Sequence, residues 1–209
     1  MTTKEWLDEV AKSALCTRTT LQATYDAACA VIRNGVPGDF VECGVWAGAN
    51  SAVMAKATSC YGGRGRRVHL FDSFEGIPEA GPNDVGWTHP EGTSACSIET
   101  TKQQMKAWGI PDELLVYHPG WFKDTMQDAR NPWDVRSDGK GAYIHTIALL
   151  RLDADLYEST RVCMEHLYPL VSPGGIVIVD DYRLSGCRRA VNEYFMPDGS
   201  PGPIYFFKD

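Results

Sequence analysis

Strand and helix patterns alternate along this chain, and that order limits its fold more than any other feature of the sequence. Five apolar strand patterns are predicted at residues 39–43, 67–71, 114–118, 144–152 and 176–179. Helical patterns at residues 49–58, 97–108, 157–170 and 186–195 lie between or after them. Residues 147–150 and 176–179 are uninterrupted apolar runs, which is typical of strands buried on both faces. The order predicts an α/β fold of Rossmann-like type, with a mostly parallel central sheet and helices on both faces.

The length of 209 residues favours a single domain. Residues 1–36 are predicted to form two N-terminal helices, at 4–15 and 19–33, which end at the breaker sequence Asn34-Gly35-Val36-Pro37-Gly38. Residues 37–209 are predicted to form the core, with a last strand at 204–207.

Composition excludes several classes of function. The net charge of −7 argues against nucleic acid as a partner, because binding to phosphate needs a concentrated basic surface. We find no apolar run near the ~18 residues of a membrane span, so we expect no membrane partner. The seven cysteines are irregularly spaced without a C-x-x-C pair, which argues against a zinc site. Together with the lack of a signal peptide, they predict reduced thiols and a cytoplasmic location.

Ligands of parallel α/β sheets bind at the carboxyl ends of the strands, so the residues that follow each strand deserve most weight. The first strand runs into a loop bounded by Gly44 and Gly48, and the helix that follows offers free backbone N–H groups. Asp72 ends the second strand, where an acidic residue can accept hydrogen bonds from ribose hydroxyls. Loop and acid together favour a nucleoside ligand. The alternatives are a plain strand-to-helix turn and a capping or solvated acid.

Acidic residues follow two further strands. Asp153 ends one, and Asp180 and Asp181 end another. If these strands are neighbours, the three carboxylates meet at one edge and repel each other unless a cation holds them. Hard oxygen ligands suit Mg²⁺, with Mn²⁺ or Ca²⁺ as alternatives. The competing interpretation is that each acid caps the helix after it.

A metal beside a nucleoside site suggests that the metal activates an alcohol, because a bound cation lowers the pKa of a coordinated hydroxyl. The hydroxyl proton then needs a base. Asp153 is the first candidate, and Asp155, His118 and His89 are weaker ones.

Five segments resemble the macrocin O-methyltransferase family of class I sugar methyltransferases. They are FVECGVWAGANS (residues 40–51), FDSFEGIP (71–78), GWFKDTM (120–126), LLRLDADLYEST (149–160) and LYPLVSPGGIVIVDDYRLSGCRRAV (167–191). The resemblance implies a metal-dependent O-methyltransferase that transfers a methyl group from S-adenosylmethionine to a sugar hydroxyl. A deoxysugar such as rhamnose, in a glycan or glycoside, is the preferred acceptor. The resemblance also implies that copies of the chain can form a homo-oligomer.

The resemblance implies specific residue roles as well. S-adenosylmethionine would lie over the loop from Gly44 to Gly48, with the ribose near Asp72. Mg²⁺ would bind Asp153, Asp180 and Asp181, with Asp153 as a metal-bound base. The full set expected at the cofactor is Glu42, Gly44, Val45, Trp46, Gly48, Ser51, Asp72, Ser73 and Phe122.

The sequence departs from related patterns in three places. The lysine that serves as base in catechol O-methyltransferases has no match after Asp153, where Tyr157 follows instead, and this lowers a catechol-like phenol as acceptor. The chain is short for the family at both ends. Residues 79–94 show little match, so we expect acceptor identity to depend on them, with Trp87 able to stack on a sugar face. A nucleotide- or metal-binding module without turnover is the remaining alternative.

Overall fold

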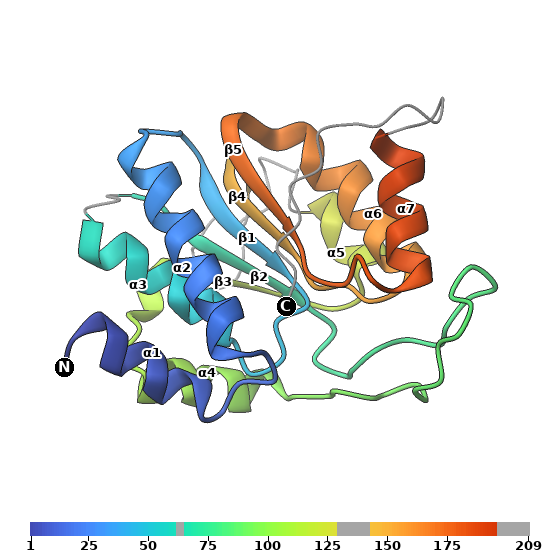
Figure 1. The fold of residues 1–209 in the computed structure, drawn as a ribbon, viewed down its shortest axis with the longest axis horizontal. Helices are drawn as coiled ribbons and strands as arrows, with labels where there is room; N and C mark the ends of the chain where they lie inside the picture. The colour runs from blue at the N-terminus through green and yellow to red at the C-terminus, as the bar shows by residue number, and fades with distance from the viewer. Residues whose placement is uncertain (62–64, 129–142, 196–209) are drawn as a thin grey trace.

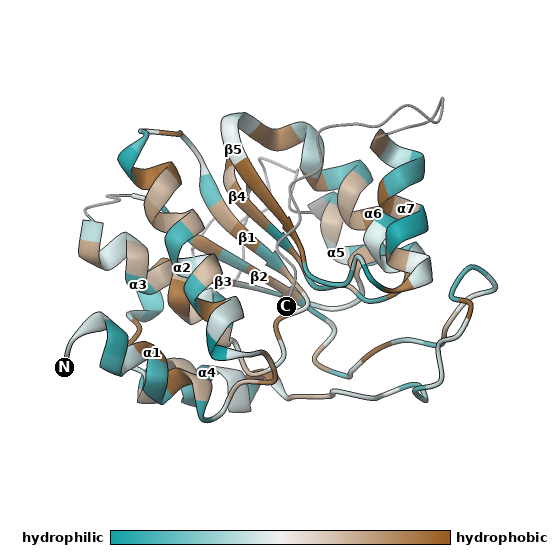
Figure 2. Ribbon diagram, viewed as in Figure 1, coloured by the Kyte–Doolittle hydropathy of each residue, from teal (hydrophilic) through white to brown (hydrophobic). Residues whose placement is uncertain are grey.

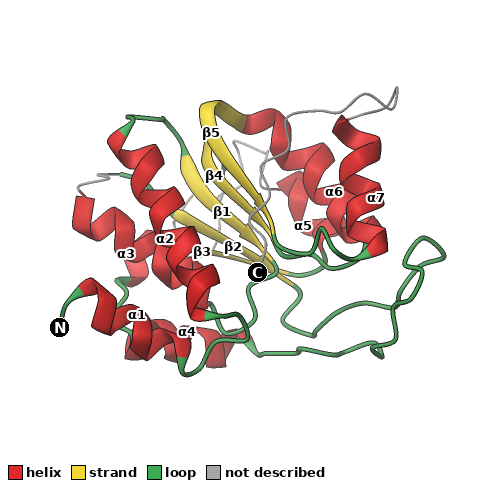
Figure 3. Cartoon of the chain, viewed as in Figure 1, coloured by secondary structure: helices red, strands yellow, loops and turns green. Residues whose placement is uncertain are grey.

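A five-stranded parallel sheet forms the centre of the computed structural model, which describes residues 1–61, 65–128 and 143–195 (Figures 1 and 3). The strands are β1 (Asp39–Cys43), β2 (Val68–Asp72), β3 (Leu115–Pro119), β4 (Ile147–Leu152) and β5 (Val171–Val179). The five strands predicted between residues 39 and 179 are all present and parallel, so the predicted fold class is confirmed. The strand predicted at residues 204–207 lies outside the described residues.

The strand order β3-β2-β1-β4-β5 places β1 at the point where the chain changes direction across the sheet. β1 pairs with β2 on one side and with β4 on the other. Ligands of open α/β sheets bind at such a switch point, beyond the carboxyl ends of the strands. The loops after β1 and β4 therefore flank the expected site.

Helices cover both faces of the sheet (Figure 1). One face carries α1 (Thr3–Ala11), α2 (Arg18–Arg33), α3 (Ala49–Tyr61) and α4 (Ile98–Ala107). The other carries α5 (Phe122–Asp128), α6 (Tyr157–Leu167) and α7 (Ser185–Phe195). Short 3₁₀ helices at Asp112–Leu114 and Tyr168–Leu170 precede β3 and β5.

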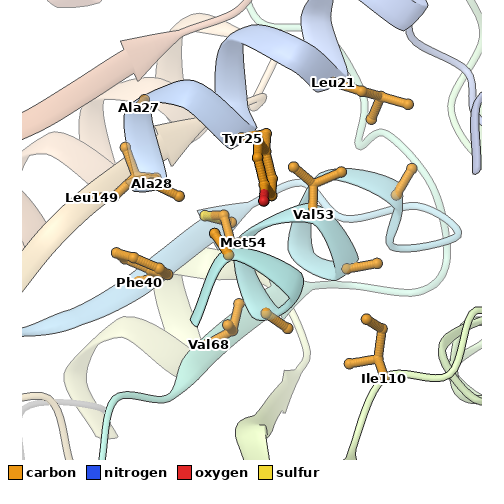
Figure 4. Close-up of a cluster of buried hydrophobic side chains, with 14 of the residues drawn as sticks. Leu21, Tyr25, Ala27, Ala28, Phe40, Val53, Met54, Val68, Ile110 and Leu149 are labelled. Carbon is orange, nitrogen blue, oxygen red and sulfur yellow. The ribbon is translucent and has the colours of Figure 1, made fainter. Parts of the chain in front are cut away.

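Alternation along the strands divides the apolar residues between two cores. Phe40 and Val68 face α2 and α3, whereas Val41 and Phe71 face α5 and α6. Figure 4 shows the first core, with Phe40 and Val68 below Met54 of α3. The strands are mainly apolar, with a few polar positions, while the outer helices carry more polar residues, as their colours in Figure 2 show.

The N-terminal helices pack into the first core. Thr2 and Glu5 form a capping box that starts α1, and the indole Nε1 of Trp6 donates to the carbonyl oxygen of Trp108 at 2.9 Å. Trp6 is only 2% exposed. This segment therefore contributes to the same hydrophobic cluster as α3 and the sheet.

The largest error of the sequence prediction concerns β5. Ser172-Pro173-Gly174-Gly175 was expected to be a turn before a strand at residue 176, but β5 begins at Val171. The pairing shifts from Ile147 opposite Val171 to Leu149 opposite Ile176, so the turn-like residues form a bulge. A proline is tolerated there because β5 is an edge strand among the described residues.

One smaller difference concerns a helix. The prediction at residues 120–128 contained no element, whereas α5 occupies Phe122–Asp128.

No helix in the described part of the chain has the length and apolar character that would let it cross a bilayer.

Candidate functional site

A cavity of about 1110 Å³ lies beyond the carboxyl ends of the strands. The loops after β1, β2, β4 and β5 line it, together with residues from the long segment between β2 and α4. Ligand cavities are typically ~300–1,000 Å³. This cavity is therefore large enough for two small molecules side by side.

The loop after β1 is shaped by backbone conformations that few residues adopt. Gly44 has φ +84°, and a Cβ at this position would collide with the carbonyl oxygen of Asp153. Trp46 has φ +47°, which is strained for a bulky residue. Thr101 of α4 donates its hydroxyl to the Trp46 carbonyl at 2.7 Å and fixes the loop. The glycine thus brings the β1 loop into direct contact with the acidic segment after β4.

Asp72 fastens this loop to the end of β2. Its Oδ2 accepts hydrogen bonds from the backbone N–H groups of Val45 at 2.6 Å and Trp46 at 3.0 Å, and its Oδ1 accepts one from Phe74 at 2.7 Å. An ionised carboxylate offers about four acceptor positions, so one remains for a ligand hydroxyl. Asp72 also lines the cavity, so it combines the anchoring role with a position suited to a ribose.

The acids after β4 and β5 are brought together as the sequence predicts. One oxygen each from Asp153, Asp180 and Asp181 lies within 4.8 Å of the other two. Oxygen ligands of an octahedral Mg²⁺ are ~3 Å apart when adjacent and ~4.2 Å apart when opposite, for a metal–oxygen distance of ~2.1 Å. The three carboxylates would therefore have to move closer together, by up to ~2 Å, to share one cation.

Arg151 of β4 is the feature that the sequence interpretation missed. Its side chain is 0% exposed, and its guanidinium lies 2.6 Å from Asp153 Oδ2, 2.6 Å from Asp180 Oδ1 and 3.4 Å from Glu42 Oε1. Glu42 stands opposite Arg151 in the β1–β4 register. A charged residue inside each of two buried strands was the available signal. The carboxylates thus have a protein cation as well as the expected metal to offset their repulsion.

One cation does not neutralise the whole cluster. Burial, followed by the charges of Asp153 and neighbouring acids, raises the pKa of Asp181 to about 9. Burial, followed by the charges of Asp153 and Asp180, raises the pKa of Asp155 to about 7. Negative charge is therefore still in excess, which is the condition for binding a proton or a further cation.

Asp155 has an unusual backbone. Its φ is +54°, and its N–H donates to Asp181 Oδ2 at 3.1 Å. Its carboxylate lines the cavity and accepts no hydrogen bond from any residue that the structure describes. By contrast, one oxygen of Asp153 is held by Arg151.

The residues expected at the cofactor fall into two groups. Seven line the cavity: Glu42, Gly44, Val45, Trp46, Asp72, Ser73 and Phe122. Gly48 and Ser51 do not. Gly48 has φ +91° and forms the turn into α3, and the Ser51 hydroxyl donates to Glu42. These two residues lie outside the cavity lining and stabilise it, Gly48 through the turn and Ser51 through its hydrogen bond to Glu42.

The weaker candidates for the base separate clearly. The prediction of His118 as a base is wrong, because its side chain is 0% exposed and is not part of the cavity lining. Its ring stacks on Phe71, and one ring nitrogen lies 2.9 Å from a ring nitrogen of His69. His89 lines the cavity and contacts Trp87 edge-on at 5.0 Å. Tyr157, which follows Asp153 in place of the lysine of catechol O-methyltransferases, donates its hydroxyl to Glu193 at 2.6 Å.

The chain is similar in sequence to two named O-methyltransferases. The 8-demethyl-8-(2,3-dimethoxy-alpha-L-rhamnosyl)-tetracenomycin-C 4'-O-methyltransferase of Streptomyces olivaceus is 39% identical over 180 residues, which are 83% of this chain and 64% of that protein. The demethyldecarbamoylnovobiocin O-methyltransferase of Streptomyces niveus is 40% identical over 171 residues, 78% of this chain and 60% of that protein. The chain therefore spans less than two thirds of the length of both relatives.

The fold is also shared with solved structures. The O-methyltransferase NovP superposes with a TM-score of 0.71 and 37% identity, covering 87% of this chain and 72% of that one. A family model described as Macrocin-O-methyltransferase (TylF) matches residues 3–205. The chain belongs to this family.

Proposed function

We propose that this protein is an S-adenosylmethionine-dependent, Mg²⁺-assisted O-methyltransferase that acts on a sugar hydroxyl. The observation that carries the proposal is the gathering of Asp153, Asp180 and Asp181 within 4.8 Å beside a loop suited to a nucleoside. A domain that only binds a nucleotide has no need for this cluster, because closely spaced buried charges are destabilising unless something binds them.

The methyl donor would occupy the side of the cavity formed by the loops after β1 and β2. Gly44 and Val45 would contact it through their backbone, and Asp72 would accept a hydrogen bond from a ribose hydroxyl. Phe122, at the start of α5, lines the same cavity and would pack against an apolar face of the nucleoside.

Asp153, Asp180 and Asp181 would hold the Mg²⁺, or Mn²⁺ in its place, through carboxylate oxygens. Because Arg151 already holds Asp153 Oδ2, the other oxygen of this carboxylate would be the one offered to a metal. With Arg151 counted, the three ligands carry a formal charge of −3 + 1 = −2, which matches a divalent ion. A bound metal would lower the pKa of a coordinated acceptor hydroxyl.

Methyl transfer forms an oxygen–carbon bond, breaks the sulfur–carbon bond and releases the hydroxyl proton to a carboxylate. Asp153 stays a candidate for this role as a metal ligand. Asp155 is the stronger one, because it lines the cavity beside the metal ligands and its carboxylate accepts no hydrogen bond from any residue that the structure describes.

We propose a deoxysugar such as rhamnose, in a glycan or glycoside, as the acceptor. The Streptomyces olivaceus relative is named for a rhamnosyl substrate, and Trp87 and His89 line the cavity together with the acids. Aromatic and polar side chains together suit a sugar, which has an apolar face and hydroxyl edges.

The test combines calorimetry with a methyl-transfer assay. We expect the Asp153→Asn variant to lose both Mn²⁺ binding and transfer to methyl α-L-rhamnopyranoside. The Asp155→Asn variant is expected to retain Mn²⁺ binding but lose transfer, because it removes only the base. Normal transfer by Asp153→Asn would refute the metal site. Normal transfer by Asp155→Asn, with none by Asp153→Asn, would return the role of base to Asp153.

A further inference from the structure

The segment between β2 and α4 contributes Trp87 and His89 to the cavity lining, and hydrogen bonds hold this segment in place at two points. Its stem closes where the N–H of Ile77 donates to the Thr93 carbonyl and the N–H of Gly92 donates to the Ile77 carbonyl, both at 2.9 Å. Figure 1 shows the segment running from β2 to beneath α6 and α7. Residues 78–91 thus form a loop that reaches to the helices on the other face of the sheet.

Asp84 makes the second attachment, which joins the loop to the start of α6. Its Oδ1 accepts a hydrogen bond from the N–H of Tyr157 at 2.7 Å, and its Oδ2 accepts one from Gly81 at 3.0 Å. The residue before α6, Leu156, provides no side-chain cap of its own. Asp84 therefore caps α6 from 73 positions earlier in the chain, immediately after the acidic segment that ends β4.

Gly186 of α7 leaves space for the Asp84 carboxylate. A Cβ on Gly186 would collide with Asp84 Oδ1, so only glycine allows the contact. Two further hydrogen bonds join the loop to α7: Ser185 Oγ donates to the Val85 carbonyl at 2.6 Å, and Arg189 Nη1 donates to Asn83 Oδ1 at 2.8 Å. Four hydrogen-bonding side chains and one glycine are thus matched across segments that lie far apart in the sequence.

This fastening fixes the position of Trp87. The N–H of Trp87 donates to the Asp84 carbonyl at 3.1 Å, and the half-buried Trp87 lines the same cavity as the acids. The indole Nε1 is shielded from solvent and has no hydrogen-bond partner among the residues that the structure describes. A buried N–H without a partner is unfavourable, so Nε1 gains a hydrogen bond when the indole turns to present it to an acceptor oxygen in the cavity.

We propose that Asp84 is a positioning residue that fastens the loop to α6, so that Trp87 donates its indole N–H to an oxygen of the acceptor sugar. This inference rests on the proposed function for the identity of the acceptor. The fastening itself does not depend on it.

Two variants disrupt the packing of Asp84 against α6 and α7, one by changing Asp84 and the other by changing Gly186. Asp84→Ala removes the carboxylate, whereas Gly186→Ala leaves every polar group in place and excludes the carboxylate sterically. We expect both to increase amide hydrogen exchange of residues 79–94 by at least about 10-fold, measured by mass spectrometry. The control is Asp8→Ala, which removes an exposed, ion-paired carboxylate of α1. If exchange in both variants matches the control, Asp84 does not fasten the loop.

Trp87→Phe tests recognition separately, because it keeps a ring and removes the N–H. We expect unchanged exchange, unchanged affinity for S-adenosylmethionine and a KM for methyl α-L-rhamnopyranoside raised about 2- to 12-fold, the scale of one lost hydrogen bond. An unchanged KM would overturn the role of Trp87. If the wild-type protein binds S-adenosylmethionine but does not methylate the rhamnoside, the proposed acceptor is wrong, and so is the proposed bond from Trp87 to it. The exchange data then decide the role of Asp84 alone.

Discussion

Replacing Arg151 by methionine tests whether the buried guanidinium balances the acidic cluster. The side chain is 0% exposed, and three carboxylates lie within 3.4 Å of it. Methionine fills a similar volume without charge, so the main effect is to leave buried carboxylates without their partner. Breaking a buried ion pair in this way destabilises a protein by ~3–5 kcal/mol. For a chain of this size that corresponds to a fall in Tm of roughly 6–20 °C.

The chain offers a matched control in Arg161. It has two carboxylate partners at 2.5 Å, Glu158 and Glu165, as Arg151 has two at 2.6 Å, but its side chain is 37% exposed on α6. Exposed ion pairs contribute ~0.2–1 kcal/mol, so Arg161→Met should change stability by no more than about 1–2 kcal/mol for its two pairs. The comparison isolates burial, because the substitution and the number of nearest partners are similar.

Urea unfolding in EDTA, repeated with excess Mg²⁺, measures both variants. We expect Mg²⁺ to restore part of the loss in Arg151→Met, because a bound cation supplies positive charge at the same carboxylates and stabilises the folded state by mass action. We expect no such recovery in Arg161→Met. If Arg151→Met unfolds at the same urea concentration as Arg161→Met, the guanidinium does not balance the cluster.

Three further predictions address the loops and the acids. Asp72→Ala should weaken binding of S-adenosylmethionine by ~1.5–3 kcal/mol, because it frees the β1 loop and removes a charged acceptor; unchanged affinity by calorimetry would exclude Asp72 from the cofactor site. Gly44→Ala should abolish binding of S-adenosylmethionine or destabilise the fold, since its Cβ collides with the Asp153 carbonyl, and a variant with normal affinity and Tm would show that the close approach is dispensable. In EDTA, the free energy of unfolding should fall as pH rises from about 5 to about 8, because Asp155 and Asp181 keep protons in the folded state, with pKa values of about 7 and about 9, that they lose in the unfolded chain. Mg²⁺ should make this dependence on pH weaker, because the metal replaces the protons. A free energy of unfolding that rises with pH in EDTA would contradict the raised pKa values.

The strands were predicted well because their signal is local. Runs of buried apolar residues fix β1, β2 and β4 within a few residues, and the parallel order follows from the helices between them. The start of β5 was missed because Pro173 and two glycines have turn propensity. Pairing with β4 overrides that propensity through a bulge at the sheet edge.

The acidic cluster was predictable because acids at neighbouring strand ends must meet. The roles of Arg151 and Asp84 were not, because each depends on contacts between residues far apart in the sequence. Arg151 gives no sign of its partners beyond its charge in an apolar strand, and Asp84 lies in a polar loop where an aspartate is ordinary. His118 shows the converse error, since a histidine at a strand end suggests chemistry but here fills the space beside Phe71.

Methyl transfer from S-adenosylmethionine to methyl α-L-rhamnopyranoside, followed as formation of S-adenosylhomocysteine in Mg²⁺ and then in EDTA, tests the proposed function most directly. We expect transfer in Mg²⁺, its loss in EDTA and its recovery when Mg²⁺ is restored. Transfer that is insensitive to EDTA would contradict the metal site formed by Asp153, Asp180 and Asp181. No transfer in Mg²⁺, despite binding of S-adenosylmethionine, would contradict the sugar acceptor.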